Sequence, residues 1–241
     1  MLDNVIKKIY NKYLKYTFVN NYKYIVTIML YFLYQINFFP SLIISLGFNF
    51  FKLPKTPRML ILGLTDLVYI VLLILMYKKE IKKGLVDLKK NFKSRASIMV
   101  NCWLIGCIIM FISSFLISFI IKKDVSTNEA LVRESIKLAP IYMLFTCSII
   151  APIFEEMVFR NSLYGLIKKK WAFIIISGLA FGLLHVIGNY TSPLDFLYII
   201  PYGAMGSSFA YLFVTTNNIT LPIAIHMIHN TILVITQILG G

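Results

Sequence analysis

Long apolar stretches, separated by short segments rich in lysine, make up most of this chain. A helix needs about 20 apolar residues to cross the hydrocarbon core of a bilayer, and seven stretches reach or approach that length. They cover residues 24–50, 59–77, 97–121, 136–165, 171–189, 194–214 and 219–239. The pattern predicts an all-α fold, a polytopic integral membrane bundle of about seven transmembrane helices.

The first stretch is longer than one span requires, and it contains Pro40 close to Gln35 and Asn37. Proline inside a helix removes a backbone hydrogen bond and kinks the helix. Two arrangements therefore fit residues 24–50: one kinked span, or a shorter span followed by a segment in the membrane interface.

Residues 1–22 form a basic N-terminal segment of their own. Apolar side chains recur there at a helical period among the lysines, at Ile6, Tyr10, Leu14 and Phe18. This pattern favours an amphipathic helix in the membrane interface, and a solvated basic tail is the alternative.

Composition supports the membrane interpretation. The 241 residues are 59% hydrophobic and 14% charged, against roughly 45–50% apolar and about 25% charged in soluble domains. The net charge of +14 lies mainly in segments between the apolar stretches. That distribution is typical of cytoplasmic loops facing anionic lipid, so membrane lipids, and no nucleic acid, are the expected partners.

The distribution of basic residues also predicts an orientation. With the N-terminus inside, sixteen lysines and arginines face the cytoplasm, including eight in a basic loop over 78–95, and seven face outward. This bias follows the positive-inside rule and predicts an N-in, C-out protein. Arg160 is left within the membrane.

Three short motifs place ionisable side chains in the apolar stretches. The first, EExxxR, contains Glu155, Glu156 and Arg160. Glu156 and Arg160 are four residues apart and share one helix face, where a guanidinium can hold a carboxylate ionised. Glu155 lies about 100° around the helix, so it is free to act while its neighbour is neutralised. A buried ion pair that only joins two helices is the structural alternative.

The other motifs are FxxxH, with Phe181 one helical turn before His185, and HxxxN, with His226 and Asn230 on one face. Both His226 and Asn230 can donate hydrogen bonds to a developing oxyanion. His229 borders that face, but packing against another helix is its simpler role. Charged and imidazole groups at bilayer depth are costly unless they are paired or face a cavity.

Together these groups supply the parts of a peptide hydrolase. A glutamate and a histidine can activate a water, while a second histidine and an asparagine stabilise the tetrahedral intermediate. Alternatively, Glu155, His185 and His226 could ligate a metal such as zinc, although the HExxH signature is absent.

Other polar residues have simpler explanations. Asp66 is expected to make a helix–helix hydrogen bond, and Asp195, after Pro193, to lie at a helix N-terminus. Ser207 and Ser208 share a helix with two glycines and are expected to allow close packing. All three cysteines lie in apolar helices and are expected to pack there without disulfides or metal: Cys102, Cys107 and Cys147.

The three motifs, in this order on successive apolar segments, resemble the CPBP family of CAAX-protease and bacteriocin-processing intramembrane proteins, also called the Abi family. The resemblance covers roughly residues 135–240, and it implies type II CAAX prenyl endopeptidase-like chemistry. By it, Glu155 and His185 activate the water and His226 with Asn230 form the oxyanion site. Glu156, Arg160 and Phe181 are supporting residues, with Glu156 and Arg160 holding the first glutamate. Both a zinc-dependent and a metal-free, glutamate-dependent mechanism fit the resemblance.

Three parts are therefore expected: the basic segment 1–22, transmembrane helices over 23–134, and a catalytic core over 135–241. The resemblance and the Lys/Asn/Ile-rich composition imply a bacterial cytoplasmic membrane protein that cleaves a membrane-associated or secreted peptide. Peptide processing and bacteriocin self-immunity are the implied roles. A non-catalytic immunity or scaffold protein that binds a toxin or transporter is the main alternative, and a proton-relaying transporter is a third. The sequence predicts no oligomeric state.

Overall fold

The computed structural model describes residues 21–47 and 49–240. Within these residues, six helices are long and apolar enough to cross a membrane, or seven when one bent pair counts as a span. This agrees with the predicted all-α bundle, and the chain is a multi-pass membrane protein. The predicted amphipathic helix of residues 1–22 falls almost wholly outside the described residues.

The spans follow the predicted apolar stretches closely. They are Asn21–Gln35 with α2 (Phe38–Ser45), α3 (Lys55–Met76), α5 (Phe92–Ile121), α7 to α9 (Pro140–Ile167), α10 (Lys170–Ile187), η4 with α11 (Pro193–Thr216) and α12 (Thr220–Gly240). Three short elements of the described residues connect the spans: η1 (Phe50–Lys52), α4 (Lys78–Lys90) and α6 (Thr127–Leu138).

The first apolar stretch is broken, as expected, but not at the proline. The helix ending at Gln35 and α2 are bent by 58°, and the break contains Asn37 in the left-handed conformation, with φ 50°. Asparagine visits that region more readily than most residues. Pro40 is buried in the first turn of α2, where the missing N–H costs little.

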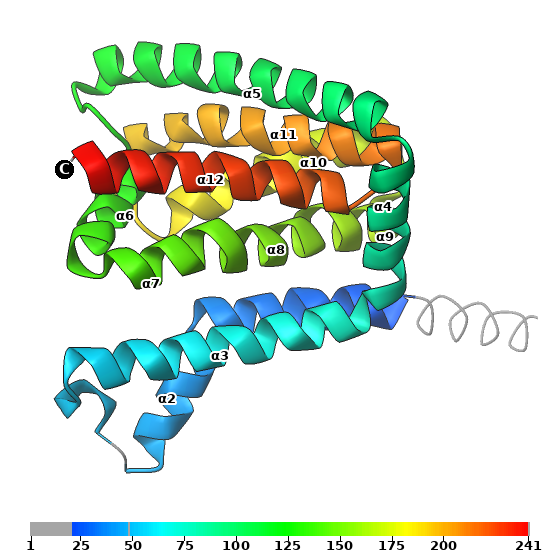
Figure 1. Ribbon diagram of the computed structural model, residues 1–241. Coiled ribbons are helices and arrows are strands. Elements are labelled where there is room, and N and C mark those ends of the chain that lie inside the picture. Colours follow the sequence, from blue (N-terminus) through cyan, green and yellow to red (C-terminus); the bar gives the residue numbers. More distant parts are fainter. Residues whose placement is uncertain (1–20, 48, 241) are drawn as a thin grey trace, which may run out of the picture.

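The basic segment predicted over 78–95 is mostly helical. Lys78–Lys90 form a helix, α4, which crosses one end of the bundle from α3 to the start of α5 (Figure 1). Apart from Gly84, nearly every residue in it is a good helix former. Gly84 is buried against the start of α12, where Asn218 donates a hydrogen bond of 2.9 Å to its carbonyl. The basic segment is thus a helix that ties the first helices to α12.

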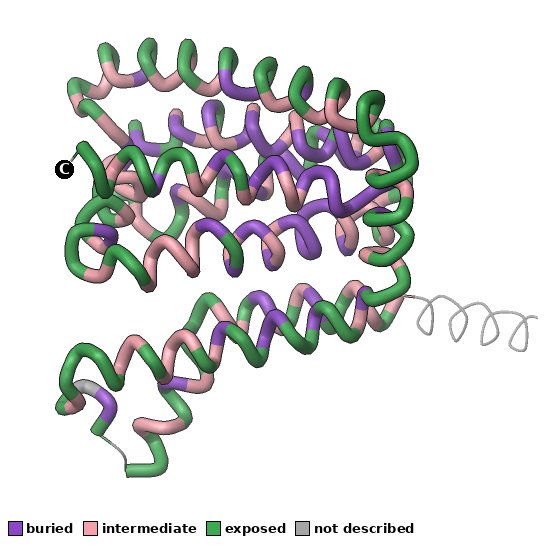
Figure 2. The backbone as a smooth tube through the Cα atoms, in the orientation of Figure 1, coloured by how far each residue is buried: buried purple, intermediate pink, exposed green. Residues whose placement is uncertain are grey.

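Buried residues gather where α8, α10, α11 and α12 face one another, whereas much of α5 is exposed on its outer side (Figure 2). The contact between α10 and α11 depends on glycine. A Cβ added at Gly182 would lie 2.6 Å from the carbonyl oxygen of Ile199. Ser208 Oγ also donates a hydrogen bond to the Cys102 carbonyl. The predicted close packing around Ser207 and Ser208 is confirmed.

Three further minor predictions are confirmed. Asp66 accepts hydrogen bonds from Tyr142 (3.2 Å) and Thr146 (3.3 Å) on a neighbouring span. Asp195 completes a capping box with Ser192 at the start of η4 (Pro193–Tyr198). Cys102 and Cys107 of α5 pack in a buried apolar cluster with residues of α11 and α12.

The first helix and α3 form a hairpin beside the bundle (Figure 1). Aromatic rings connect this hairpin to the bundle. Phe154 of α8 stacks on Tyr34 at 5.0 Å between centroids and lies 5.7 Å from both Tyr31 and Tyr69. Such ring pairs stabilise an interface beyond the area they bury. The hairpin therefore packs against the turn that precedes the EExxxR motif.

Candidate active site

The two adjacent glutamates end α8 (Ala151–Glu156), a short helix between two π-helical turns. These turns are η2 (Thr146–Ile150) and η3 (Met157–Ser162). π-Helical turns are rare in proteins, and those that occur often lie at functional sites. No feature of the sequence predicted them.

Glu156 and Arg160 form the ion pair predicted from their spacing. Arg160 Nε lies 2.9 Å from Glu156 Oε2, and both side chains have no exposed surface. The guanidinium also donates a 3.2 Å hydrogen bond to the Gly206 carbonyl, and it lies over the rings of Phe181 and Phe209, at 4.8 and 5.6 Å. A buried charge needs such a set of partners to be tolerated.

His226 lies between the two glutamates. Its Nδ1 is 2.8 Å from Glu156 Oε1, and its Nε2 is 3.8 Å from Glu155 Oε2. A carboxylate paired with arginine only accepts hydrogen bonds, so Nδ1 carries a proton and donates it. Glu155 remains slightly exposed, at 12% of its side-chain surface. The Glu156–Arg160 pair thus orients His226, where the resemblance implied that it supports Glu155.

His185 lies near this cluster but is not bonded to it. Its Nδ1 is 2.8 Å from the Phe181 carbonyl, which can only accept, so Nε2 is left for other partners. The imidazole stacks on Tyr202 at 4.6 Å and lies 4.5 Å from the Phe181 ring. A cavity of about 10 Å³ beside it is lined partly by Asn128 and Asn189, which is about the space that one water requires.

Phe181 connects the two halves of the predicted site. Its ring contacts Arg160 and His185, and it lies 5.9 Å from the His226 ring. The structure thus brings Glu155, Glu156, Arg160 and His226 into direct contact, with His185 one aromatic ring away.

Asn230 and His229, on the same helix as His226, make contacts with other spans. Asn230 Nδ2 donates a 2.9 Å hydrogen bond to the Cys147 carbonyl in the π-helical turn η2, which leaves its second amide hydrogen for another acceptor. His229 Nδ1 accepts a 3.2 Å hydrogen bond from Trp103 of α5. His229 therefore bonds another helix, as expected.

The predicted metal ligands do not fit a metal site in their present positions. Within the part of the chain that the structure describes, no three His, Cys, Asp or Glu side chains form a possible metal-binding group. The Nδ1 atoms of His226 and His185 lie at hydrogen-bond distance from Glu156 and from a carbonyl, an arrangement that is also found in metal-ligating histidines. A zinc site at Glu155, His185 and His226 therefore stays a prediction.

Sequence reasoning missed Tyr202 and Phe209, both on α11. Tyr202 stacks on His185, and its hydroxyl is 2.7 Å from Ser126 Oγ. Phe209 is fully buried beside His226, with ring centroids 5.2 Å apart. Neither residue belongs to a motif, and their positions depend on the close approach of α10 and α11.

Comparison with known proteins finds relatives among membrane peptidases. Residues 137–232 match the family model described as Type II CAAX prenyl endopeptidase Rce1-like. The chain is 34% identical over 116 residues to "Putative membrane peptidase YdiL" of Bacillus subtilis (strain 168), covering 47% of this chain and 44% of that protein. It is 30% identical over 172 residues to "Membrane-embedded CAAX protease MroQ" of Staphylococcus aureus (strain USA300), covering 66% of each. No solved structure is a significant match.

The matches extend unequally along these relatives. The chain spans 44% of the length of the Bacillus protein and 66% of the length of the Staphylococcus protein. The matched region, 137–232, contains all three motifs and every residue of the buried cluster around His226 that was predicted from the sequence. Through this region, the chain belongs to the type II CAAX prenyl endopeptidase Rce1-like family.

Proposed function

We propose that this chain is an intramembrane endopeptidase that hydrolyses a peptide bond near the membrane surface with a water activated by Glu155 and His185. The single observation that supports this most is the placement of His226 between Glu156, at 2.8 Å, and Glu155, at 3.8 Å. A structural ion pair would need only Glu156 and Arg160. A second carboxylate beside the same imidazole has no structural purpose that we can identify.

As an oxyanion donor, His226 must carry a proton on both ring nitrogens in this mechanism, because Nδ1–H donates to Glu156. Its Nε2 lies on the side of Glu155. The positive charges of this imidazolium and of Arg160 would then equal the negative charges of the two ionised glutamates.

In the proposed reaction, Glu155 accepts a proton from the water, whose oxygen attacks the carbonyl carbon of the scissile bond. His185, through its free Nε2, positions or activates the same water. The oxyanion of the tetrahedral intermediate accepts hydrogen bonds from Nε2–H of His226 and from Asn230. When the C–N bond breaks, Glu155 returns its proton to the leaving amine. No metal takes part in these steps.

The proposed substrate is a membrane-associated or secreted peptide of a bacterium. The relative MroQ is described by its name as a CAAX protease of the membrane, and we extend only its reaction class to this chain. Peptide processing or bacteriocin self-immunity is the proposed role.

The second candidate is a non-catalytic immunity or scaffold protein that binds a toxin or transporter. The full burial of the Glu156–Arg160 pair favours it, because such a pair can join helices without chemistry. The slight exposure of Glu155 is harder to reconcile with a purely structural role.

The test compares secreted peptides, by mass spectrometry, from a deletion strain complemented with the wild type or with Glu155→Gln. Glutamine keeps the shape of the side chain but cannot accept the proton, so the peptide difference should disappear while the protein is still expressed. Glu134→Gln, at an exposed glutamate of α6, is the matched control and should behave as the wild type. Full function of Glu155→Gln would contradict the endopeptidase proposal and favour the scaffold.

A further inference from the structure

A second cavity lies away from the glutamates. It has a volume of about 440 Å³, within the range of ligand pockets in proteins. Its walls come from the first helix, from α9 (Leu163–Ile167) with the turn before it, and from the end of α11. The side chains that line it include Tyr24, Asn161, Tyr164, Lys168, Phe213 and Asn217.

This cavity is separate from the candidate active site. Arg160 points toward the Gly206 carbonyl and the Phe181 ring. The next residue, Asn161, projects from a different side of the π-helical turn and lines the cavity. None of the proposed catalytic residues is part of its wall.

The walls combine aromatic and polar groups. Tyr24, Tyr164 and Phe213 provide aromatic surface, and Tyr164 and Phe213 pack edge to face at 5.6 Å. The ring of Tyr24 lies directly against Gly165, where any Cβ would collide with it. Asn161 Nδ2 is buried and makes no hydrogen bond of standard geometry, although the Tyr77 hydroxyl lies near it. The cavity thus offers apolar walls together with an amide whose hydrogen-bonding capacity is not filled.

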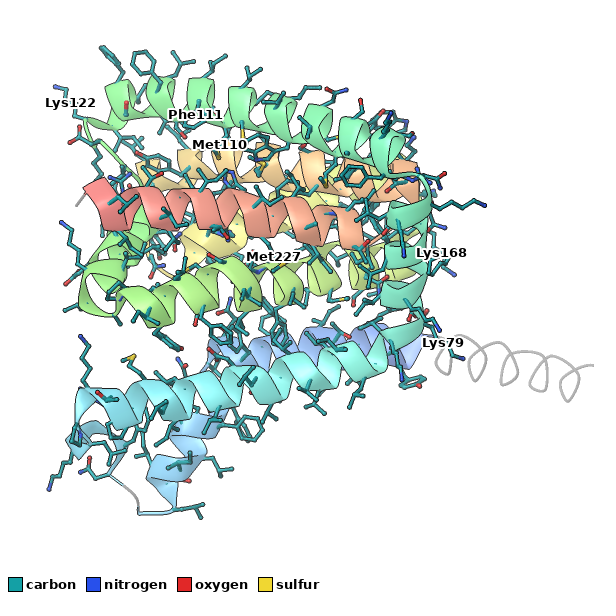
Figure 3. All side chains as sticks on the ribbon, in the orientation of Figure 1. Lys79, Met110, Phe111, Lys122, Lys168 and Met227 are labelled. Carbon is teal, nitrogen blue, oxygen red and sulfur yellow. The ribbon has the colours of Figure 1, made fainter. Side chains whose placement is uncertain are left out.

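The position of the cavity indicates the charge of its ligand. Lys168 lies at the same end of the bundle as Lys79, and Lys122 lies at the other end (Figure 3). The end with Lys168 also carries α4, with its run of lysines. A basic pocket between helices at the membrane surface is typical of sites for anionic lipid headgroups.

The C-termini of two helices lie at the cavity, and their partial negative charges disfavour an anion. The positive charge of the nearby lysines is larger. α9 and α11 both end at the cavity, with Lys168 and Asn217 as their C-caps. Each helix C-terminus carries roughly half a negative charge. Lys168 lines the cavity with a full positive charge, and Lys169 and Lys170 follow it outside the wall, so the balance of charge at this end of the bundle favours an anion.

We propose that this cavity binds the headgroup of an anionic phospholipid. Lys168 pairs with the phosphate, the amides of Asn161 and Asn217 donate hydrogen bonds to headgroup oxygens, and the aromatic walls contact the glycerol and the first part of the acyl chains. The inference does not depend on the proposed peptidase activity, because it uses none of those residues.

The test uses the purified full chain in detergent, with phosphatidylglycerol or phosphatidylcholine of identical acyl chains as probes. Bound lipid is counted by native mass spectrometry, and the shift in melting temperature is measured in parallel. The proposal expects at least tenfold tighter binding of phosphatidylglycerol. Equal binding of the two lipids would overturn it.

Two charge reversals locate the site. Lys168→Glu should reduce phosphatidylglycerol binding at least tenfold, whereas Lys169→Glu, one residue outside the cavity wall, should reduce it less than threefold. Equal losses would mean diffuse attraction to a basic surface and would overturn the site. Asn161→Ala, which keeps every charge, should also weaken binding, and an unchanged affinity would contradict the assigned hydrogen bond.

A competition assay separates lipid from a soluble anion. Glycerol 3-phosphate carries the phosphate without acyl chains, so it should not displace phosphatidylglycerol at a hundredfold excess. Full displacement would identify a soluble phosphate ligand and overturn the lipid assignment. Melting without added lipid should be the same for Lys168→Glu and Lys169→Glu, which shows that both fold.

Discussion

Glu156 Oε1 lies 2.8 Å from His226 Nδ1, so the second glutamate of the EExxxR motif makes the close contact with the imidazole. Arg160 holds the other oxygen of the same carboxylate. The three residues form a buried chain from guanidinium to carboxylate to imidazole, and it ends opposite Glu155. The conformation of His226 is therefore set by Glu156, while Glu155, at the longer distance of 3.8 Å, is the residue proposed to act as the base.

Replacing Arg160 with alanine should destabilise the protein strongly, because it leaves the Glu156 carboxylate buried without its partner. Breaking a buried pair in this way costs about 3–5 kcal/mol. Arg133→Ala is the matched control, since Arg133 forms an ion pair of the same spacing and the same 2.9 Å length with Glu129, but at the surface. That change should cost less than about 1 kcal/mol. Thermal melting in detergent compares the two, and equal melting temperatures would contradict the buried pairing.

His226→Ala and His229→Ala should differ in their effect on cleavage. His226 contacts both glutamates, so its loss should lower the rate by about 10² or more. His229 bonds Trp103 on α5, so its loss should lower the rate less than tenfold. A rate assay on the purified variants measures this, and equal losses would place His229 in the site.

The ring of Tyr202, which stacks on His185, should hold the imidazole in position. Tyr202→Phe keeps the stacked ring and loses only the hydroxyl contacts with Ser126 and Asn128, a loss of about 1 kcal/mol in stability. Tyr202→Ala removes the ring itself, so the rate should fall at least about tenfold, because misplaced catalytic groups are costly. If alanine and phenylalanine gave the same rate, Tyr202 would have no positioning role.

Gly182→Ala should destabilise the packing of α10 on α11. The added methyl group would lie 2.6 Å from the Ile199 carbonyl oxygen and 3.0 Å from the Gly203 nitrogen, and overpacking of this kind typically costs about 1–3 kcal/mol. Gly63→Ala is the control, since no atom lies within 4 Å of a Cβ there. It should leave stability unchanged or raise it by up to about 1 kcal/mol. Thermal melting of both variants checks the prediction.

Stability should fall at acid pH through Asp87, which lies in α4 outside the spans. Hydrogen bonds from Arg95, Asn218 and Asn91 lower the pKa of this carboxyl to about 2, below the value of about 3.9 for an unfolded aspartate. A lowered folded pKa stabilises the protein above pH 4, and the contribution is lost as the pH falls from about 4 to 2. Asp87→Asn should therefore melt below the wild type at pH 6 and close to it at pH 2. Asp124→Asn, at an exposed aspartate, should show no such convergence.

Much of the fold followed from the sequence, because helices in lipid must satisfy their own backbone hydrogen bonds and so must be long and apolar. The spans over 171–189 and 219–239 needed little correction. The helix within 78–95 was not predicted, because the lysines there were interpreted only for their charge, although they are also good helix formers. Its packing on Asn218 depends on residues more than 120 positions away, and no local pattern reports such a contact.

The sequence predicted which residues form the candidate site, but it did not predict most of the contacts between them. Spacing alone paired Glu156 with Arg160, because residues four apart share a helix face. Spacing between segments carries no such information, so the contact of Glu156 with His226 and the bond from Asn230 to Cys147 became visible only in three dimensions. The stacking of Tyr202 on His185 depends on the close approach of two helices. The roles of Glu155, His185, His226 and Asn230 in catalysis remain predictions.

The aromatic contacts of Phe154 have a consequence for the part of the chain that carries no motif. Phe154 immediately precedes Glu155, and tyrosines of the first helix and of α3 surround its ring. Rotation of α8 about its axis would break these aromatic contacts of Phe154. The N-terminal hairpin therefore fixes the direction in which Glu155 points. Substitutions at Tyr31, Tyr34 or Tyr69 can thus impair a reaction whose chemical groups all lie more than 80 positions further along the chain.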